Sequence, residues 1–104
     1  EKDKILKQQL IDEIIDKVCS HFNVTTTAVN SRSRKQDIVL ARQVSMYLAQ
    51  KHTKMPASRI GKLVGGRDHS TVLHSCSQIE KRLQVDKGFT AELSTIENSF
   101  KLKL

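Results

Sequence analysis

The sequence of 104 residues has few residues that interrupt helices and few aromatic side chains. It contains one proline, four glycines, no tryptophan, one tyrosine and three phenylalanines. The shortage of proline and glycine favours helices. Because aromatics are scarce, the core must be built mainly from isoleucine, leucine and valine. A chain of this length forms one domain with one modest core.

Other absences narrow the class of protein. No apolar run is long enough to span a membrane, and we recognise no signal peptide. The only cysteines, Cys19 and Cys76, lie far apart on predicted apolar helix faces. This favours buried thiols in a reducing compartment over a disulfide, so we expect a cytoplasmic protein. The chain begins at Glu1 rather than at methionine, which we interpret as the start of a fragment.

Acidic residues are also too few to balance the basic ones. The chain has 18 lysines and arginines against 11 aspartates and glutamates, which gives a net charge of +7. A small domain this basic indicates an anionic partner, such as nucleic acid, a membrane surface or an acidic protein. Solubility alone is the weaker explanation, because the basic residues recur beside predicted turns and helix ends.

The spacing of apolar residues predicts an all-α domain of five or six helices, without strands. Residues 1–7 are expected to be a connector from an upstream domain, and residues 8–104 the helical domain. Asp37, Asp68 and Thr90 are the expected N-caps of three helices, and Gly88 is expected to end the helix before Thr90. The predicted helices cover residues 7–22, a single turn within 23–31, 37–52, 57–64, 68–87 and 90–100.

Two details of these helices bear on function. Arg42 and Gln43 are expected to face solvent, opposite the apolar stripe of their helix. Gly61 inside the short helix costs about 1 kcal/mol relative to alanine, which a close approach of another helix backbone would justify.

The run "GGRDHSTVLHS", residues 65–75, joins the short helix to the next one through a tight turn. A short helix, a glycine-containing turn and a second helix are the parts of a helix-turn-helix. Such a turn lifts the start of the second helix clear of the domain, so that its first side chains reach a DNA major groove. Small or polar side chains that suit base edges stand there: Asp68, His69, Ser70 and Thr71. In addition, the N-terminus of a helix attracts phosphate.

Metal sites and enzymatic chemistry fit the sequence poorly. His69 and His74 are five residues apart, and the cysteines form no pair at zinc-finger spacing. The chain has no phosphate-binding loop of the G-x-x-x-x-G-K-[ST] type. Asp68, His69 and Ser70 are adjacent, so they do not form a catalytic relay across one site. We therefore predict a binding module without a metal or catalytic site.

The run "RDHSTVLH" (67–74), preceded by Ile60-Gly61 and Gly65-Gly66, resembles the signature of the C-terminal DNA-binding domain of DnaA, the bacterial replication initiator family. The stretch "ARQVSMYLA" (41–49) and the basic loop before it are also similar. The resemblance covers roughly residues 8–100. It implies a Trp-repressor-like helical domain that binds double-stranded DNA at the DnaA boxes of a replication origin, and hence a protein associated with the nucleoid. It also implies that ATP, the cofactor of such initiators, belongs to an ATPase domain outside this chain.

The resemblance implies a role for individual residues. Arg34 of the basic loop matches an arginine that enters the minor groove, Arg42 and Gln43 match a pair that touches phosphates, and His74 matches a histidine on the DNA backbone. The segment from Asp68 to Thr71 matches the residues that read bases or flanking phosphates. Ser70 stands where threonine is common, and Ser58 stands where proline is usual. The predicted DNA-binding residues are Arg34, Arg42, Gln43, Ser58, Arg67, Asp68, His69, Ser70, Thr71 and His74; secondary candidates are Gln50, Lys54, Lys62, Gln78 and Lys81.

A second class of function stays open at this stage. A basic helical module could bind an acidic protein, a replication regulator or an acidic phospholipid surface, using Met46, Tyr47 and the first helix. We expect the isolated domain to be a monomer. Binding to duplexes of different sequence separates the two classes, because nonspecific attraction loses affinity with salt and shows little sequence preference.

Overall fold

The structure is a computed structural model that describes residues 2–101, with side chains described for residues 5–100. In this part of the chain it contains six α-helices and no strand, which confirms the predicted all-α class. The helices are α1 (Lys2–Phe22), α2 (Thr26–Val29), α3 (Gln36–Thr53), α4 (Ala57–Leu63), α5 (His69–Val85) and α6 (Lys87–Lys101).

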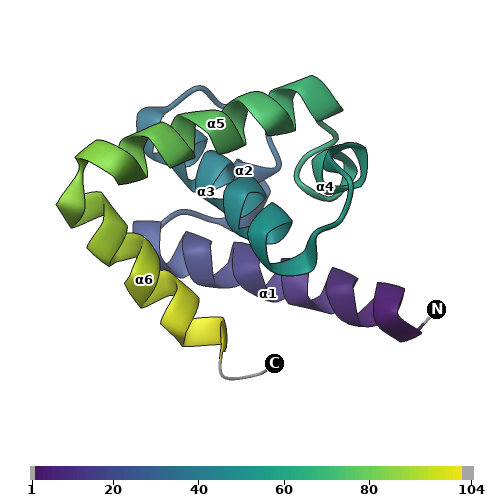
Figure 1. The fold of residues 1–104 in the computed structure, drawn as a ribbon. Helices are drawn as coiled ribbons and strands as arrows, with labels where there is room; N and C mark the ends of the chain where they lie inside the picture. Colours follow the sequence, from purple (N-terminus) through teal and green to yellow (C-terminus); the bar gives the residue numbers. More distant parts are fainter. Residues whose placement is uncertain (1, 102–104) are drawn as a thin grey trace.

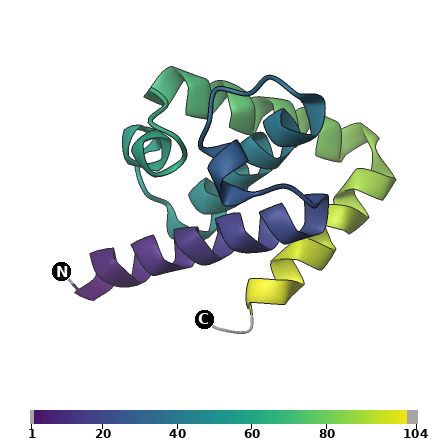
Figure 2. The same cartoon turned by 180° about the vertical axis from the view of Figure 1, so that it is seen from behind.

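Helix α3 is the centre of the domain (Figure 1). Helices α1 and α5 pack against it, and α6 contacts both α1 and α5 at one end of the molecule. Helix α4 packs beside α5 and α3 at the other end. Seen from behind, α2 and the loop that follows it lie against α3 (Figure 2). This arrangement leaves the start of α5 at the edge of the domain, next to α4.

The core is aliphatic, as the composition predicts. The apolar stripes of α1, α3 and α5 converge on it, and each contributes residues that are fully buried, such as Ile14, Val44 and Val72. Phe89 is 1 % exposed and was not predicted as a core residue. Cys19 and Cys76 are free and buried, which confirms the prediction of buried thiols. Burial raises the pKa of both thiols, that of Cys76 to about 11.

Helix α1 begins at Lys2, before the predicted start at Lys7. Residues 2–7, predicted as a connector, therefore continue α1 in the structure. Their role in joining an upstream domain stays a prediction. Glu1 lies outside the described residues.

Two predicted helix boundaries are wrong. Helix α3 begins at Gln36, with Lys35 at the cap position, and the Asp37 carboxylate accepts a hydrogen bond from the neighbouring Ile38 N–H instead of capping the helix. Helix α5 ends at Val85 rather than before Gly88. Asp86 takes the cap position that Thr90 was expected to hold, because its Oδ1 accepts from the Phe89 N–H at 3.0 Å.

Two further predictions concern single side chains. Met46, expected to be available to a partner, is 0 % exposed, and that prediction is wrong because Met46 belongs to the core. Tyr47 is half-buried beside the core. The short turn expected within residues 23–31 is confirmed as α2, and Thr25 caps it by accepting from the Ala28 N–H at 3.0 Å.

Candidate nucleic-acid interface

The turn between α4 and α5 depends on two consecutive glycines. Gly65 and Gly66 have φ values of 79° and 67°, in the left-handed region that other residues rarely adopt. The Arg67 N–H then donates to the Gly61 carbonyl at 2.7 Å. A Cβ atom at Gly61 would collide with the Arg67 carbonyl oxygen, so the predicted close approach is confirmed, although the turn backbone rather than another helix makes it.

The start of α5 is capped and exposed. Oδ1 of Asp68 accepts from the Thr71 N–H at 2.8 Å, which confirms Asp68 as the N-cap. Hydrogen bonding with Thr71 holds the pKa of the Asp68 carboxyl below its usual value. The side chains of Asp68, His69, Ser70 and Thr71 are exposed, as is His74 one turn later. The domain's own helices therefore leave this end of α5 open to a large partner.

The basic loop, residues 31–35, is ordered without a hydrophobic anchor. The Ser31 hydroxyl donates to the Ala28 carbonyl at 2.6 Å and accepts from the Ser33 N–H at 3.1 Å. The Ser33 hydroxyl accepts in turn from the Lys35 N–H at 3.3 Å. These short-range bonds shape the backbone and leave the side chain of Arg34 exposed.

Arg42 does not face solvent, so the prediction of its position is wrong. It is 8 % exposed. Its Nε donates to the Val29 carbonyl at 2.9 Å, and its Nη2 donates to the carbonyls of Ser31 and Ser33 at 2.9 and 3.1 Å. Burial lowers the pKa of Arg42, and the nearby charge of Arg67 lowers it further. The loop folds back over α3, so that the carbonyl groups of Ser31 and Ser33 cover the guanidinium of Arg42.

A concavity of about 530 Å³ brings the basic loop and the start of α5 together. Four arginines line it without any carboxylate, so its potential is strongly positive. It unites four of the predicted site residues: Arg34, Arg42, Arg67 and Thr71. The complete lining is Arg32, Ser33, Arg34, Arg42, Gly65, Gly66, Arg67 and Thr71.

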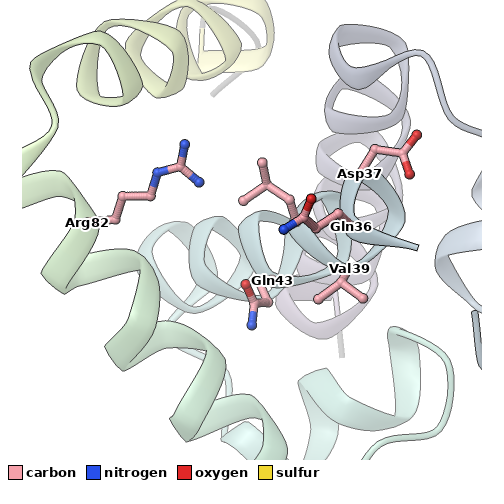
Figure 3. A pocket seen from close by; sticks show the side chains of 6 residues that line it. Gln36, Asp37, Val39, Gln43 and Arg82 are labelled. Carbon is pink, nitrogen blue, oxygen red and sulfur yellow. The ribbon is translucent and has the colours of Figure 1, made fainter. Parts of the chain in front are cut away.

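Gln43 lies at a different hollow, between α3 and α5. Figure 3 shows Gln36 and Gln43 of α3 on one side and Arg82 of α5 on the other, while the Asp37 carboxylate points away from Arg82. An adjoining hollow adds Gln78 and Lys81, two of the secondary candidates. Arg82 is engaged by Asp86 at 3.5 Å and by the Phe89 ring at 4.1 Å. Besides Arg82, the polar side chains that line these two hollows are Gln36, Asp37, Gln43, Gln78 and Lys81.

The remaining predicted residues are more scattered. Ser58, the second residue of α4, is exposed and does not line the arginine concavity. The sequence-based site set omitted Arg32, which lines the concavity. The repeated Ser-Arg pattern of the loop is the signal that could have included it.

The described residues offer neither a metal centre nor a helix that could cross a membrane. Among the described side chains, no group of three or more histidine, cysteine, aspartate or glutamate residues is placed to hold a metal ion. Within residues 2–101, each helix is too short or too polar to cross a bilayer.

Comparison with known proteins identifies relatives for almost the whole chain. The sequence model of the family described as "Bacterial dnaA protein helix-turn-helix" matches residues 11–79. The chain is 47 % identical over 95 residues to the chromosomal replication initiator protein DnaA of Bacteroides fragilis, which covers 91 % of this chain and 20 % of that protein. The protein of the same name from Bacteroides thetaiotaomicron is 45 % identical over 97 residues, 93 % of this chain and 21 % of that protein.

A relative from another genus gives the same result. The DnaA protein of Streptococcus thermophilus strain LMD-9 is 45 % identical over 91 residues, 88 % of this chain and 20 % of that protein. The chain thus spans about a fifth of the length of the curated relatives it matches. The matched family segment includes the basic loop, the turn and most of α5.

Proposed function

The chain belongs to the bacterial DnaA helix-turn-helix family, and on this premise we propose that it binds double-stranded DNA sequence-specifically, as the module of a chromosomal replication initiator that recognises DnaA boxes. The observation that carries the proposal is the open first turn of α5, where Asp68 caps the helix and the neighbouring side chains are exposed. An N-terminal turn of this kind is what a helix-turn-helix places in the major groove.

Four residues of this turn would read the major groove. The His69 ring offers a hydrogen bond or an apolar edge, and Thr71 offers a hydroxyl and a methyl group for a thymine. Ser70 offers a hydroxyl alone. Asp68 already accepts the Thr71 N–H with one oxygen, which leaves its second oxygen for a cytosine amino group. The negative charge of Asp68 repels the phosphates of the DNA backbone. We therefore assign Asp68 to the discrimination between bases.

The basic residues would hold the DNA backbone and the neighbouring minor groove. Arg34 is exposed on the loop beside the start of α5, a position that suits insertion into a narrow, A·T-rich minor groove. Arg67 lies at the rim shared with Thr71. Arg42 makes its three hydrogen bonds through Nε and Nη2, so Nη1 is the atom that would meet a phosphate. Phosphate contacts fix register rather than sequence.

Three further residues would complete the backbone contacts. Gln43 borders the hollow between α3 and α5, and His74 lies one turn after Ser70 on the exposed face of α5. Ser58 presents an exposed hydroxyl near the start of α4. Each is a hydrogen-bond donor that suits a phosphate oxygen.

A binding selection from random duplexes at about 0.15 M salt tests the function. We expect enrichment of one short motif, bound roughly a thousandfold more tightly than random DNA. Salt-sensitive binding without enrichment of any sequence motif would show that the chain binds DNA nonspecifically. Failure to bind duplexes, together with retention on acidic phospholipid vesicles, would favour the alternative of a basic module for acidic surfaces.

A further inference from the structure

Two arginines from different elements hold the basic loop in place. Nη2 of Arg42, from α3, and Nη2 of Arg67, from the turn before α5, both donate to the carbonyl oxygen of Ser31. Arg42 also holds the carbonyls of Val29 and Ser33. The carbonyl oxygen of Ser31 is therefore held by one arginine from α3 and by a second from the turn before α5.

Arg67 also ties the loop to the helix-turn-helix. Its Nη1 donates to the Gly65 carbonyl within the turn, and its backbone N–H donates to the Gly61 carbonyl of α4 at 2.7 Å. The next residue, Asp68, caps α5. The hydrogen bonds of Arg67 thus connect the loop to the turn that leads directly into α5, and we call Arg42 and Arg67 the arginine clamp.

The clamp holds two like charges together without a carboxylate. The concavity that both line has no acidic residue, and the charge of Arg67 lowers the pKa of Arg42. Carbonyl oxygens alone compensate the burial of Arg42. Hydrogen bonds from a charged donor are roughly twice as strong as neutral ones, so this arrangement makes the loop rigid.

We propose that the clamp fixes the distance between Arg34 on the loop and Thr71 on α5, and thereby sets the number of base pairs between the minor-groove contact and the major-groove contact. This inference rests on the proposed function, because it takes both residues to be at the DNA. One base-pair step moves the next step by about 3.4 Å along the duplex. An unrestrained loop absorbs such a shift, whereas a loop held at Ser31 and Ser33 does not. Arg42 and Arg67 are thus positioning residues that make the module sensitive to spacing.

The test uses the selected box and two derivatives, with one base pair inserted or removed between the A·T-rich edge and the remainder. Arg67→Lys is the main variant, because lysine keeps the charge but lacks the planar fork that reaches the Gly65 and Ser31 carbonyls together. The matched control is Arg82→Lys, the same exchange at a residue engaged by Asp86 and Phe89.

We expect the wild-type protein and Arg82→Lys to bind the altered boxes at least about tenfold more weakly than the native box. In Arg67→Lys this ratio should fall to about threefold or less, because the loop adjusts to either spacing. If Arg67→Lys keeps the wild-type ratio, the proposal is overturned, whatever its absolute affinity. If the wild-type protein shows no preference for any box, the proposed function itself fails, which is a distinguishable result.

Amide hydrogen exchange in the free protein gives a second readout that does not depend on DNA. In Arg67→Lys we expect faster exchange of the Ser33 and Lys35 amides, while the amides of α1 exchange as in the wild type. Arg42→Lys should produce the same local change if it folds. Unchanged protection of the loop in Arg67→Lys would show that the clamp does not hold the loop.

Discussion

The two ends of α3 both carry basic side chains, and these find different hydrogen-bond partners. Near the start of α3, Arg42 donates only to backbone carbonyls. At the other end, Lys51 and His52 both bind Oε2 of Glu97 on α6, at 2.9 and 2.7 Å. The His52 ring also packs edge-on against Phe100, with centroids 5.1 Å apart.

The difference indicates which end is suited to an anion. The Glu97 carboxylate offsets the charge of Lys51, so this contact fastens α6 to α3 and leaves little of that charge to attract a ligand. Carbonyl oxygens stabilise a guanidinium but leave its net charge in place. Together with Arg32, Arg34 and Arg67, Arg42 therefore keeps a concentrated positive potential at its end of α3.

The largest effect is expected from Gly61→Ala, which would displace the turn and with it Arg67, one of the arginines at the charged end of α3. The added Cβ collides with the Arg67 carbonyl oxygen, so the turn must move or α4 must shift. We expect a loss of roughly 2 kcal/mol or more in the free energy of unfolding. Thermal or denaturant unfolding measures it, and box binding should fall with it.

Gly88→Ala is the matched control for this exchange. A Cβ at Gly88 meets only Oδ1 of Asp86 at 3.5 Å, which is ordinary contact. We expect a gain of up to about 1 kcal/mol from the reduced freedom of the unfolded chain. Similar losses for Gly61→Ala and Gly88→Ala would mean that the close approach at Gly61 is unimportant.

Next in size are His69→Ala and Thr71→Ala, which leave the charge of the interface in place and remove its reading groups. Each should reduce the preference for the box over random duplex by about tenfold or more, with little change in nonspecific affinity. Competition binding at constant salt measures the ratio. Ser77→Ala, an exposed position later on α5, serves as the control. An equal loss on box and random DNA would contradict base reading by His69 and Thr71.

These residues also show what the sequence could predict. The cap at Asp68 and the exposed first turn of α5 depend on residues within a few positions of one another, so local pattern was sufficient. The fold class followed in the same way from helical spacing in α1, α3 and α5. The boundary between α5 and α6 was misplaced because Asp86, Gly88 and Thr90 all offer plausible end signals, and the capping bond to Phe89 decides among them.

The burial of Arg42 at the charged end of α3 could not be predicted, because its hydrogen bonds reach carbonyls 9 to 13 positions away in the sequence. Helical spacing places Arg42 opposite the apolar stripe and therefore on the surface. The loop that covers it has no apolar residue to reveal that it folds back over α3. The bond from Arg67 to Ser31 spans 36 positions and has no local signal. Long-range contacts of polar side chains are the part of this site that required the structure.

A smaller effect, confined to stability, is expected from Glu97→Gln at the other end of α3. Burial by itself raises the pKa of Glu97, but hydrogen bonds from Lys51 and His52 outweigh it and hold the pKa below the usual value. At neutral pH we expect the free energy of unfolding to fall by about 1 kcal/mol, with unchanged box preference. A loss of box preference without a loss of stability would contradict the division between the two ends.

The pH dependence of this variant has a definite sign. A carboxyl whose pKa is lowered in the folded state stabilises the protein above its unfolded pKa, near 4.5. That stabilisation is lost as the pH falls through the folded pKa. The gap between the wild type and Glu97→Gln should therefore narrow as the pH falls below the ordinary value of 4.5 and through the lower folded-state pKa. Unfolding curves at several pH values measure it, with Glu92→Gln, whose carboxylate lies at 3.4 Å from His21, as the more exposed control.

The smallest effect is expected from Lys81→Ala, which tests how far the uncompensated charge extends from the start of α3. Lys81 is exposed at the hollow between α3 and α5, beside Gln43 and Gln78. If a phosphate passes there, affinity for box and random duplex should fall equally, and the slope of log affinity against log salt should decrease by about one. Lys87→Ala, at an exposed lysine at the start of α6, should leave the slope unchanged.

Equal slopes for Lys81→Ala and the wild type would confine the DNA backbone to the arginine concavity and the first turns of α5. A change limited to one base position would instead make Lys81 a reading residue, because a phosphate contact carries no sequence information.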